Sequence, residues 1–383
     1  MSGSTFLPVA AEPVPALAGA LAEPKPPGRA VRLRQALFGG PVSGVVTVLL
    51  GLLLLRALWG ILDWGVFSAV WSVPVSATGT PDPSVCKTAA AGACWAAVGE
   101  KYRLVLFGVY PYGEQWRPLI VLVVFVGLYI ASSMRRCWRP MLAGAWAAGL
   151  IVVFGLMWGG VLGLTYVSQD QWGGLPITLI LATFGLVLAF PLAVIVALGR
   201  RARSLPAVRI LCIVYVELIR GVPLISVLFM ATLLLPLFLP EGLSFDKLLC
   251  AQVGIILFAA AYLAEVVRGG LQALPAGQAE AANALGLSYW QKTLLIELPQ
   301  ALRIVIPPLV NTALGLFKDT SLVAIVGILD LTRSAEAAIS DPVWSSFSTE
   351  IFLFIAVIYF AFCFAMSRYS HGLERSLSRN RKR

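Results

Sequence analysis

Four charged residues stand inside stretches of the chain that are otherwise almost entirely apolar. Glu217 and Arg220 lie in one stretch, and Lys318 and Asp319 lie in another. A charge is costly within a bilayer, so each is by default a candidate for binding a charged ligand. Because both signs are present, the set could hold a ligand that carries both charges. The alternative is two structural ion pairs, Glu217 with Arg220 one helical turn away and Lys318 with Asp319.

These charges are predicted to lie near the middle of the membrane or beyond it. Lys318 stands about 22 Å along a helix from the basic residue that begins its stretch. Gly221 and Pro223 follow Arg220 and are expected to unwind the helix there. Unwound backbone at this depth is tolerated where protein or a water-filled cavity satisfies it, and half-helix ends can hold charged groups. Further polar residues could line such a cavity, although hydrogen bonding between helices is an alternative role for each: Tyr262, Asn311, Thr320 and Ser321.

The composition is that of an integral membrane protein, and the fold class we expect is all-α. Hydrophobic residues make up 59% of the chain and charged residues 13%, whereas soluble domains average about 25% charged residues. The apolar runs are continuous, which favours helices over the alternating strands of a β-barrel. The fifth run is too long for one straight helix, so Pro236 or the Gly221/Pro223 pair should interrupt it. Eight spans are predicted: 43–62, 118–134, 140–159, 176–198, 210–238, 248–267, 304–328 and 350–367.

The net charge of +10 is explained by membrane topology rather than by nucleic-acid binding. When the N-terminus is placed inside and eight spans are threaded, most Lys and Arg residues fall on the inner side. This distribution satisfies the positive-inside rule and predicts that both termini are cytoplasmic.

Nothing in the sequence predicts a catalytic or metal-binding residue. His371 is the one histidine, and the chain has no Gly-x-x-x-x-Gly-Lys-Ser/Thr phosphate loop. The usual route of ATP hydrolysis therefore has no counterpart here, and any ATPase must be a separate polypeptide.

A long segment, 63–117, lies outside between the first two spans and should have a small structure of its own. It contains Cys86 and Cys94, separated by a short stretch rich in Ala and Gly. An outer compartment permits disulfides, so we expect these two cysteines to be bonded. The alternative is two free thiols in a small apolar cluster.

A polar loop, 269–303, separates the sixth and seventh spans. A short helix is predicted from Gln278 to about Leu285, with Gly286 as its stop and a second helical piece starting at Ser288. Glu280 lies in the first turn, where the helix dipole favours an anion. Ala281 and Ala282 keep the helix slim enough to enter a groove on a partner.

Glu265 and Arg268 lie beside this loop, at the inner end of the sixth span. Their i,i+3 spacing would let them pair and brace the span against the loop. We assign them to coupling or structure rather than to ligand binding.

The loop resembles the "EAA" loop of the membrane subunits of bacterial ABC importers. The resemblance rests on Glu280-Ala281-Ala282, Gly286, Ile296 and Pro299. In that family the loop is a short cytoplasmic helix that seats in a groove of the ATPase subunit. The resemblance therefore implies that Glu280, Ala281, Ala282 and Gly286, with Glu265 and Arg268 beside them, couple this chain to an ATPase.

The resemblance covers roughly residues 172–370, which are similar to the core of the polar amino acid ABC permeases. It is carried by Pro-Ile-Thr at 176–178, Tyr-Val-Glu-Leu-Ile-Arg-Gly-Val-Pro-Leu at 215–224, Ala-Tyr-Leu-Ala-Glu-Val-Val-Arg-Gly-Gly at 261–270 and Lys-Asp-Thr-Ser-Leu at 318–322. The additional N-terminal spans resemble the longer subunits of general L-amino acid (Aap/Bzt-type) permeases. A five-helix type I importer core with three accessory N-terminal helices is implied. The expected divisions are 1–42, a disordered cytoplasmic tail; 43–171, accessory helices with the periplasmic loop 63–117; 172–370, the permease core with coupling loop 269–303; and 371–383, a basic tail.

This resemblance implies an inner-membrane permease subunit of an ATP-driven amino acid importer, which binds no cofactor itself. Its partners would be a second, different permease subunit, two ATPase subunits that bind ATP and Mg²⁺, a periplasmic amino-acid-binding protein and membrane lipid. An amino acid zwitterion needs an anion for its ammonium and a cation or N–H groups for its carboxylate, which the intramembrane charges could supply. Two alternatives stay open: a structural permease half that binds no substrate, and a secondary transporter, for which we find no inverted repeat.

Overall fold

The computed structural model describes residues 28–76, 79–161, 163–238, 240 and 245–381. Within these residues the chain is helical, and its β-structure is limited to isolated bridges such as that of Val70 with Cys94. The all-α prediction is therefore confirmed. The chain falls into two compact units, Met1–Phe67 and Ser68–Arg383, which are described separately.

Seven helical segments of the described residues are long and apolar enough to cross a membrane, and a bent helix pair makes an eighth. Each corresponds to one of the eight predicted spans. The second part of the predicted coupling loop, from Tyr289 onward, is continuous with the span after it, so the seventh helical segment begins and ends earlier than the predicted span. The segments are Pro41–Phe67, Tyr112–Ser133, Pro140–Trp158, Gly174–Arg201, the bent pair Pro206–Gly221 and Leu224–Phe238, Lys247–Gln272, Tyr289–Ala324 and Ser345–Arg375.

The first unit contains α1 (Arg29–Phe38) and α2 (Pro41–Leu62). The Thr47 hydroxyl of α2 donates to the Leu37 carbonyl at the end of α1, at 2.7 Å. The disordered tail predicted for 1–42 is wrong for α1, because Arg29–Phe38 contains neither proline nor glycine and consists largely of good helix formers. Residues 1–27 lie outside the described part of the chain.

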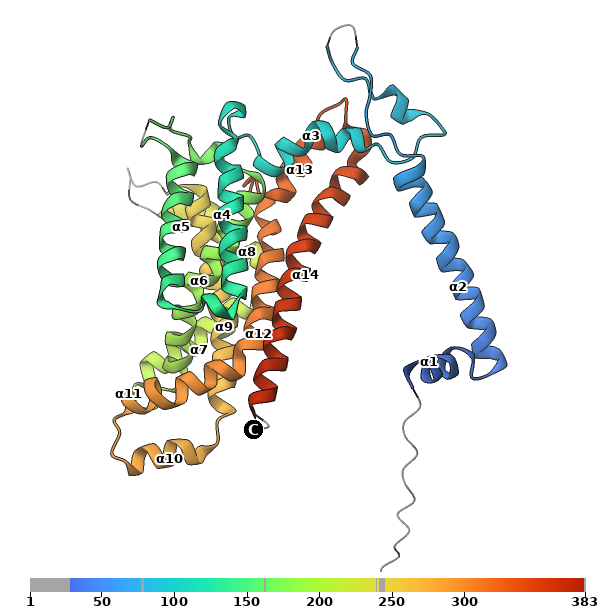
Figure 1. Ribbon diagram of the computed structural model, residues 1–383. Helices are drawn as coiled ribbons and strands as arrows, with labels where there is room; N and C mark the ends of the chain where they lie inside the picture. The colour runs from blue at the N-terminus through green and yellow to red at the C-terminus, as the bar shows by residue number, and fades with distance from the viewer. Residues whose placement is uncertain (1–27, 77–78, 162, 239, 241–244, 382–383) are drawn as a thin grey trace, which may run out of the picture. The chain divides into compact units, whose positions relative to one another are not determined.

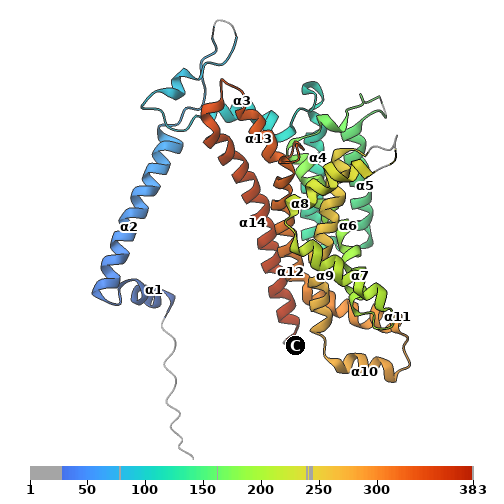
Figure 2. The same ribbon diagram turned by 180° about the vertical axis from the view of Figure 1, so that it is seen from behind.

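The second unit is built around α6 (Gly174–Arg201) and α9 (Lys247–Gln272), with α12 (Leu298–Asp319) and α14 (Ser348–Arg381) on one side (Figures 1 and 2). Small residues let the two central helices approach closely. A Cβ on Gly185 would lie 2.8 Å from Ile255 Cγ2. This close approach places α9 between α6 and α12, where it can form one wall of a cavity.

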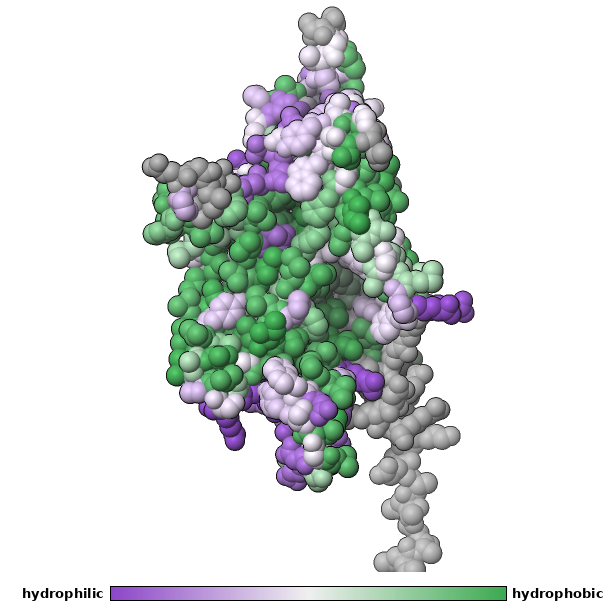
Figure 3. Space-filling view, turned by 90° about the vertical axis from the view of Figure 1, so that its left-hand side faces the viewer, coloured by the Kyte–Doolittle hydropathy of each residue, from purple (hydrophilic) through white to green (hydrophobic). Residues whose placement is uncertain are grey.

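Two accessory helices, α4 (Trp116–Ser133) and α5 (Pro140–Trp158), pack against each other, and α4 also contacts α6. The Tyr129 hydroxyl of α4 lies 2.6 Å from Thr183 Oγ1 of α6. On the face of this unit seen in Figure 3, hydrophobic residues fill the middle and hydrophilic residues gather toward the two ends. This distribution fits a bundle that crosses a bilayer.

The fifth span is broken where the sequence predicts it. The α-helix α7 (Pro206–Gly221) ends before Pro223, and α8 (Leu224–Phe229) continues at an angle of 109°. Val222 is extended, with φ −113° and ψ 136°, because the residue before a proline is disfavoured in the helical region. Of the two predicted sites of interruption, Gly221/Pro223 carries the sharp bend.

The end of the second unit that carries α3 (Trp95–Phe107) and α13 (Leu331–Ile339) lies opposite the end that carries α10 (Ala276–Ala284) and α11 (Tyr289–Gln291) (Figure 1). Lys101 of α3 pairs with Asp341 after α13 at 2.6 Å, and its ammonium lowers the pKa of that carboxyl. Asp330 caps α13 and is buried, which raises its pKa to about 6. The predicted small outer structure is thus attached to the core through α3 and α13.

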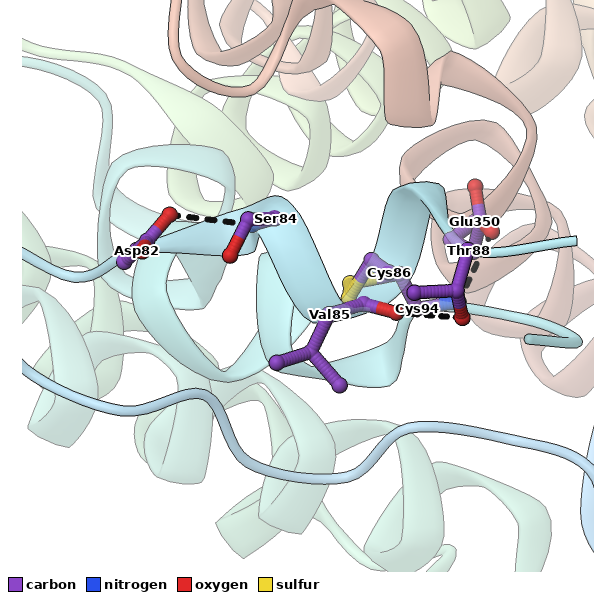
Figure 4. Close-up of a disulfide and its surroundings, with 7 residues drawn as sticks. All are labelled: Asp82, Ser84, Val85, Cys86, Thr88, Cys94 and Glu350. Carbon is purple, nitrogen blue, oxygen red and sulfur yellow. Dashed lines mark hydrogen bonds between the residues drawn. A yellow bond between two sulfur atoms is a disulfide. The ribbon is translucent and has the colours of Figure 1, made fainter. Parts of the chain in front are cut away.

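A disulfide joins Cys86 and Cys94, the two cysteines paired in the sequence analysis (Figure 4). The backbone N–H of Cys94 donates to Glu350 Oε1 at 2.9 Å, near the start of α14. The disulfide also packs in an apolar cluster with Trp344 and Phe347. The loop that it closes is therefore anchored on the α14 side of the unit.

We expect the disulfide to be visible by counting accessible thiols. After denaturation without a reductant, a maleimide should label the four cysteines other than Cys86 and Cys94, and a reductant should expose two more. In the control variant Cys86→Ser, five cysteines should be labelled without reductant, which intact-mass measurement resolves. Six labels on the untreated wild-type chain would contradict the bond.

Candidate functional site

A cavity of about 410 Å³ opens between α9 and α12. It lies in two of the membrane-length segments. The residues that line it come from one face of each helix, because positions three or four apart stack along a helix. They are Phe258, Ala259 and Tyr262 of α9, and Asn311, Thr312, Gly315, Leu316 and Asp319 of α12.

The predicted residues Tyr262, Asn311 and Asp319 come together in this cavity. Asp319 is the charged residue among those that line it. Ala259 and Gly315 leave room, while Phe258 and Leu316 supply apolar wall. The cavity therefore combines one carboxylate, an amide and a phenol with an apolar surface, which is the mixture that a small polar ligand requires.

Arg220 approaches the cavity from α7, just before the helix break. Its guanidinium carbon lies 5.4 Å from the centroid of the Tyr262 ring, a cation–π geometry. A cation from α7 thus lies near an aromatic residue of the cavity wall, while the carboxylate of Asp319 lines the same cavity from α12.

The other predicted residues lie elsewhere. Thr320 is buried and its hydroxyl donates to the Phe317 carbonyl at 2.7 Å, while Ser321 donates to the Lys318 carbonyl at 2.8 Å. Both hydroxyls thus form their hydrogen bonds within their own helical segment. Lys318 is exposed and is not among the residues that line the cavity. Among the described ion pairs there is none between Lys318 and Asp319.

The alternative in which Glu217 forms a structural pair with Arg220 is not found among the described ion pairs. Glu217 instead pairs with Arg200 of α6, at 2.9 Å. Arg200 also pairs with Glu265 of α9 at 2.9 Å, so it holds two carboxylates from two helices. Arg200 was not predicted as a functional residue, because its place at the end of a span indicates only that this end lies on the inner side of the membrane.

Glu265 and Arg268 form the predicted i,i+3 ion pair. Together with Arg200 and Glu217 they make a network of two acids and two arginines across α6, α7 and α9. We call these four residues the inner ion network. It lies toward the end of the unit that carries the loop 269–303.

The loop forms α10 (Ala276–Ala284), which begins two residues before the predicted start at Gln278. Glu280 therefore lies beyond the first turn, contrary to the prediction. Gly286 adopts φ +72°, a conformation that glycine accepts readily. The N–H of Leu287 bonds the Ala282 carbonyl at 3.1 Å, and that of Gly286 bonds the Asn283 carbonyl at 3.0 Å. These two bonds are a Schellman C-cap, so Gly286 stops the helix as predicted.

The helix that follows is attached to α10. Ser288 begins it with a capping box made with Gln291, which is the predicted second start. Lys292 Nζ donates to Asn283 Oδ1 at 3.1 Å, and Gln300 Nε2 donates to Gln278 Oε1 at 3.4 Å. The loop is therefore a folded element attached to the helical segment that leads into α12 rather than a loose connection.

The surface of this element suits docking. Ala282 is buried, whereas Glu280 and Ala281 are exposed. Large apolar side chains are exposed beside them and leave an apolar surface that a partner subunit can cover. The exposed residues are Leu285, Tyr289, Trp290, Leu294 and Leu295; sequence reasoning missed them because they follow no single period.

The chain is similar to known membrane subunits of transport systems. The family described as binding-protein-dependent transport system inner membrane component matches residues 189–379. The inner membrane amino-acid ABC transporter permease protein YhdY of Escherichia coli K12 is 45% identical, over 92% of this chain and 94% of its own length. The glutamate/glutamine/aspartate/asparagine transport system permease protein BztC of Rhodobacter capsulatus is 35% identical, over 91% and 94%. A crystal structure of an amino acid ABC transporter with histidines is 28% identical and covers 53% of this chain and 92% of its own, with a TM-score of 0.48.

Proposed function

Because the chain belongs to the family of binding-protein-dependent transport system inner membrane components, we propose that its cavity is part of the path of an amino acid across the membrane. The chain is a permease subunit of an amino-acid ABC importer in the inner membrane. It is not an enzyme, and ATP is hydrolysed by a separate subunit of the importer. The other components of such an importer are its partners.

The observation that carries this proposal is the cavity between α9 and α12, which Asp319 lines, with the Arg220 guanidinium near the ring of Tyr262 in its wall. Asp319 would accept hydrogen bonds from the ammonium of the substrate. Arg220, over the Tyr262 ring, would attract its carboxylate. Charge-assisted hydrogen bonds are stronger than neutral ones, so a zwitterion would fit the cavity better than a neutral solute. This arrangement favours a substrate-binding half over a purely structural one.

The coupling half of the proposal rests on α10. We place Glu280, Ala281 and Gly286 in the contact with the ATPase, with the exposed Leu285 beside them, whereas Ala282 is buried and supports the helix from within the chain. The ATPase pair would bind ATP and Mg²⁺, and its closure would pull α10 and reorient the helices around the cavity. In this proposal the ATP and Mg²⁺ are bound by the ATPase pair and not by α10.

The orientation follows from charge. We place the end with α10 in the cytoplasm, because Lys and Arg concentrate there. The even number of spans predicted from the sequence would put both termini in the cytoplasm as well. The opposite end, with α3, α13 and the disulfide, would then face the periplasm and receive the amino-acid-binding protein. A second, different permease chain would supply the other wall of the pathway.

The test is uptake by a reconstituted complex. The chain, its second permease, the ATPase and the binding protein are placed in proteoliposomes, and accumulation of radiolabelled amino acids is measured with and without ATP. We expect accumulation only when all four components and ATP are present. Equal uptake by vesicles that lack the ATPase, driven by an ion gradient, would contradict the proposal.

A further inference from the structure

The last two residues of α6 bond in two different directions. Arg200 donates through Nη1 to Glu265 of α9 and through Nη2 to Glu217 of α7, both at 2.9 Å. Arg201 Nη1 lies 3.4 Å from Glu297 Oε2, in the helical segment that leads from the coupling loop into α12. Consecutive residues of a helix point about 100° apart, so two neighbouring arginines can reach two different elements.

The Arg200 contacts are geometrically specific and unequally shielded. The Arg200 side chain is 12% exposed and Glu265 is 26% exposed, so water and salt screen this bond less than that of a surface pair, whereas Glu217 is 60% exposed and its bond is screened more. A guanidinium is planar and holds two carboxylates in a fixed fork, which an ammonium cannot do. Arg268 binds the same carboxylate of Glu265. Arg200 therefore fixes α7 and α9 relative to the end of α6.

The Arg201 contact joins α6 to the coupling loop. Glu297 is only 8% exposed on its side chain. The same helical segment holds Lys292, which bonds Asn283 of α10 at 3.1 Å. A continuous series of polar contacts thus runs from α10 to the segment Lys292–Glu297 and then to Arg201.

The helices that Arg200 holds are also the helices that approach the cavity. Glu265 and Tyr262 are three residues apart in α9, and Glu217 and Arg220 are three residues apart in α7. Arg220 in turn lies over the Tyr262 ring. One helical turn therefore separates each end of the Arg200 contact from a group at the cavity.

We propose that Arg200 and Arg201 form a mechanical link, in which a displacement of the coupling loop is passed through the end of α6 to α7 and α9 and hence to the cavity. The inference rests on the proposed function, because it assigns positioning residues to the transport cycle. Neither arginine touches the substrate. Their loss should uncouple ATP hydrolysis from transport without emptying the site or detaching the ATPase.

The test compares Arg200→Met with Arg203→Met in the complete reconstituted importer. Arg203 lies just beyond α6 and forms no ion pair in the described part of the chain. We expect Arg200→Met to retain the ATPase and its basal hydrolysis but to lower uptake per ATP hydrolysed about tenfold, within the usual range of coupling energies. Arg200→Lys, which keeps the charge but not the fork, should fall in between. Arg203→Met should match wild type.

A charge swap addresses the second contact and separates coupling from simple instability. Arg201→Glu alone places two carboxylates together and should reduce uptake per ATP, while Arg201→Glu with Glu297→Arg should restore it. A swap that is no better than the single change, or an Arg200→Met complex as well coupled as Arg203→Met, overturns the inference. A wild-type complex without ATP-driven uptake would instead refute the proposed function.

Discussion

Replacement of Gly286 by valine should release the ATPase and lower uptake at least about tenfold. Gly286 has φ +72° at the end of α10, and this left-handed conformation costs an L-residue roughly 1–2 kcal/mol. A β-branched side chain adds to that cost. Since no atom lies within 4 Å of a Cβ built there, the loss would come from the backbone and not from a clash. Co-purification of the tagged chain with the ATPase measures the effect.

The matched control is Gly286→Asn. Asparagine enters the left-handed region more readily than other residues and can replace glycine in a Schellman cap. Because the site is open, the larger side chain alone should do little. We expect Gly286→Asn to keep most of the association while Gly286→Val loses it. Equal retention of the ATPase by both variants, with normal uptake, would show that the end of α10 does not control docking.

Neutralisation of Asp319 should have an equally large effect on transport by a different route. Asp319→Asn keeps the size of the side chain that lines the cavity but removes the charge that would bind the ammonium of the substrate. Hydrogen bonds to charged groups contribute roughly 1.5–3 kcal/mol, so we expect uptake to fall about 10- to 100-fold. Assembly and basal ATP hydrolysis should remain.

Lys318→Met is the control for Asp319→Asn. If the two residues formed a structural ion pair, this change would leave the Asp319 carboxylate unpaired and could destabilise the fold, so a loss of uptake would not identify a role in binding. Lys318 is exposed and lies outside the cavity lining, so its neutralisation should leave uptake close to wild type. Comparable losses in both variants would argue against a specific role for Asp319.

Local sequence rules predicted much of the fold. Continuous apolar runs gave the spans because a bilayer demands about 20 apolar residues from each helix. The break at Gly221/Pro223 followed from the conformation that a proline imposes on the residue before it. The end of α10 followed from Gly286, and the start of the next helix from the capping box of Ser288.

Contacts between distant segments were not predictable in the same way. The i,i+3 spacing suggested that Arg220 would partner Glu217, but α6 brings Arg200 to Glu217 instead. Arg220 then lies against Tyr262. Periodicity says which residues share a helix face and not which helix packs opposite, so the cavity and the inner ion network required the tertiary structure.

The most direct test is an experimental structure of the assembled importer with an amino acid bound. We predict that the ligand lies between α9 and α12, with its ammonium nitrogen within about 3.2 Å of an Asp319 carboxylate oxygen. Its carboxylate should face Arg220, and α10 should contact the ATPase. A bound amino acid with no atom at hydrogen-bond distance from Asp319, Arg220 or Tyr262 would contradict the assignment of this cavity to the transport pathway.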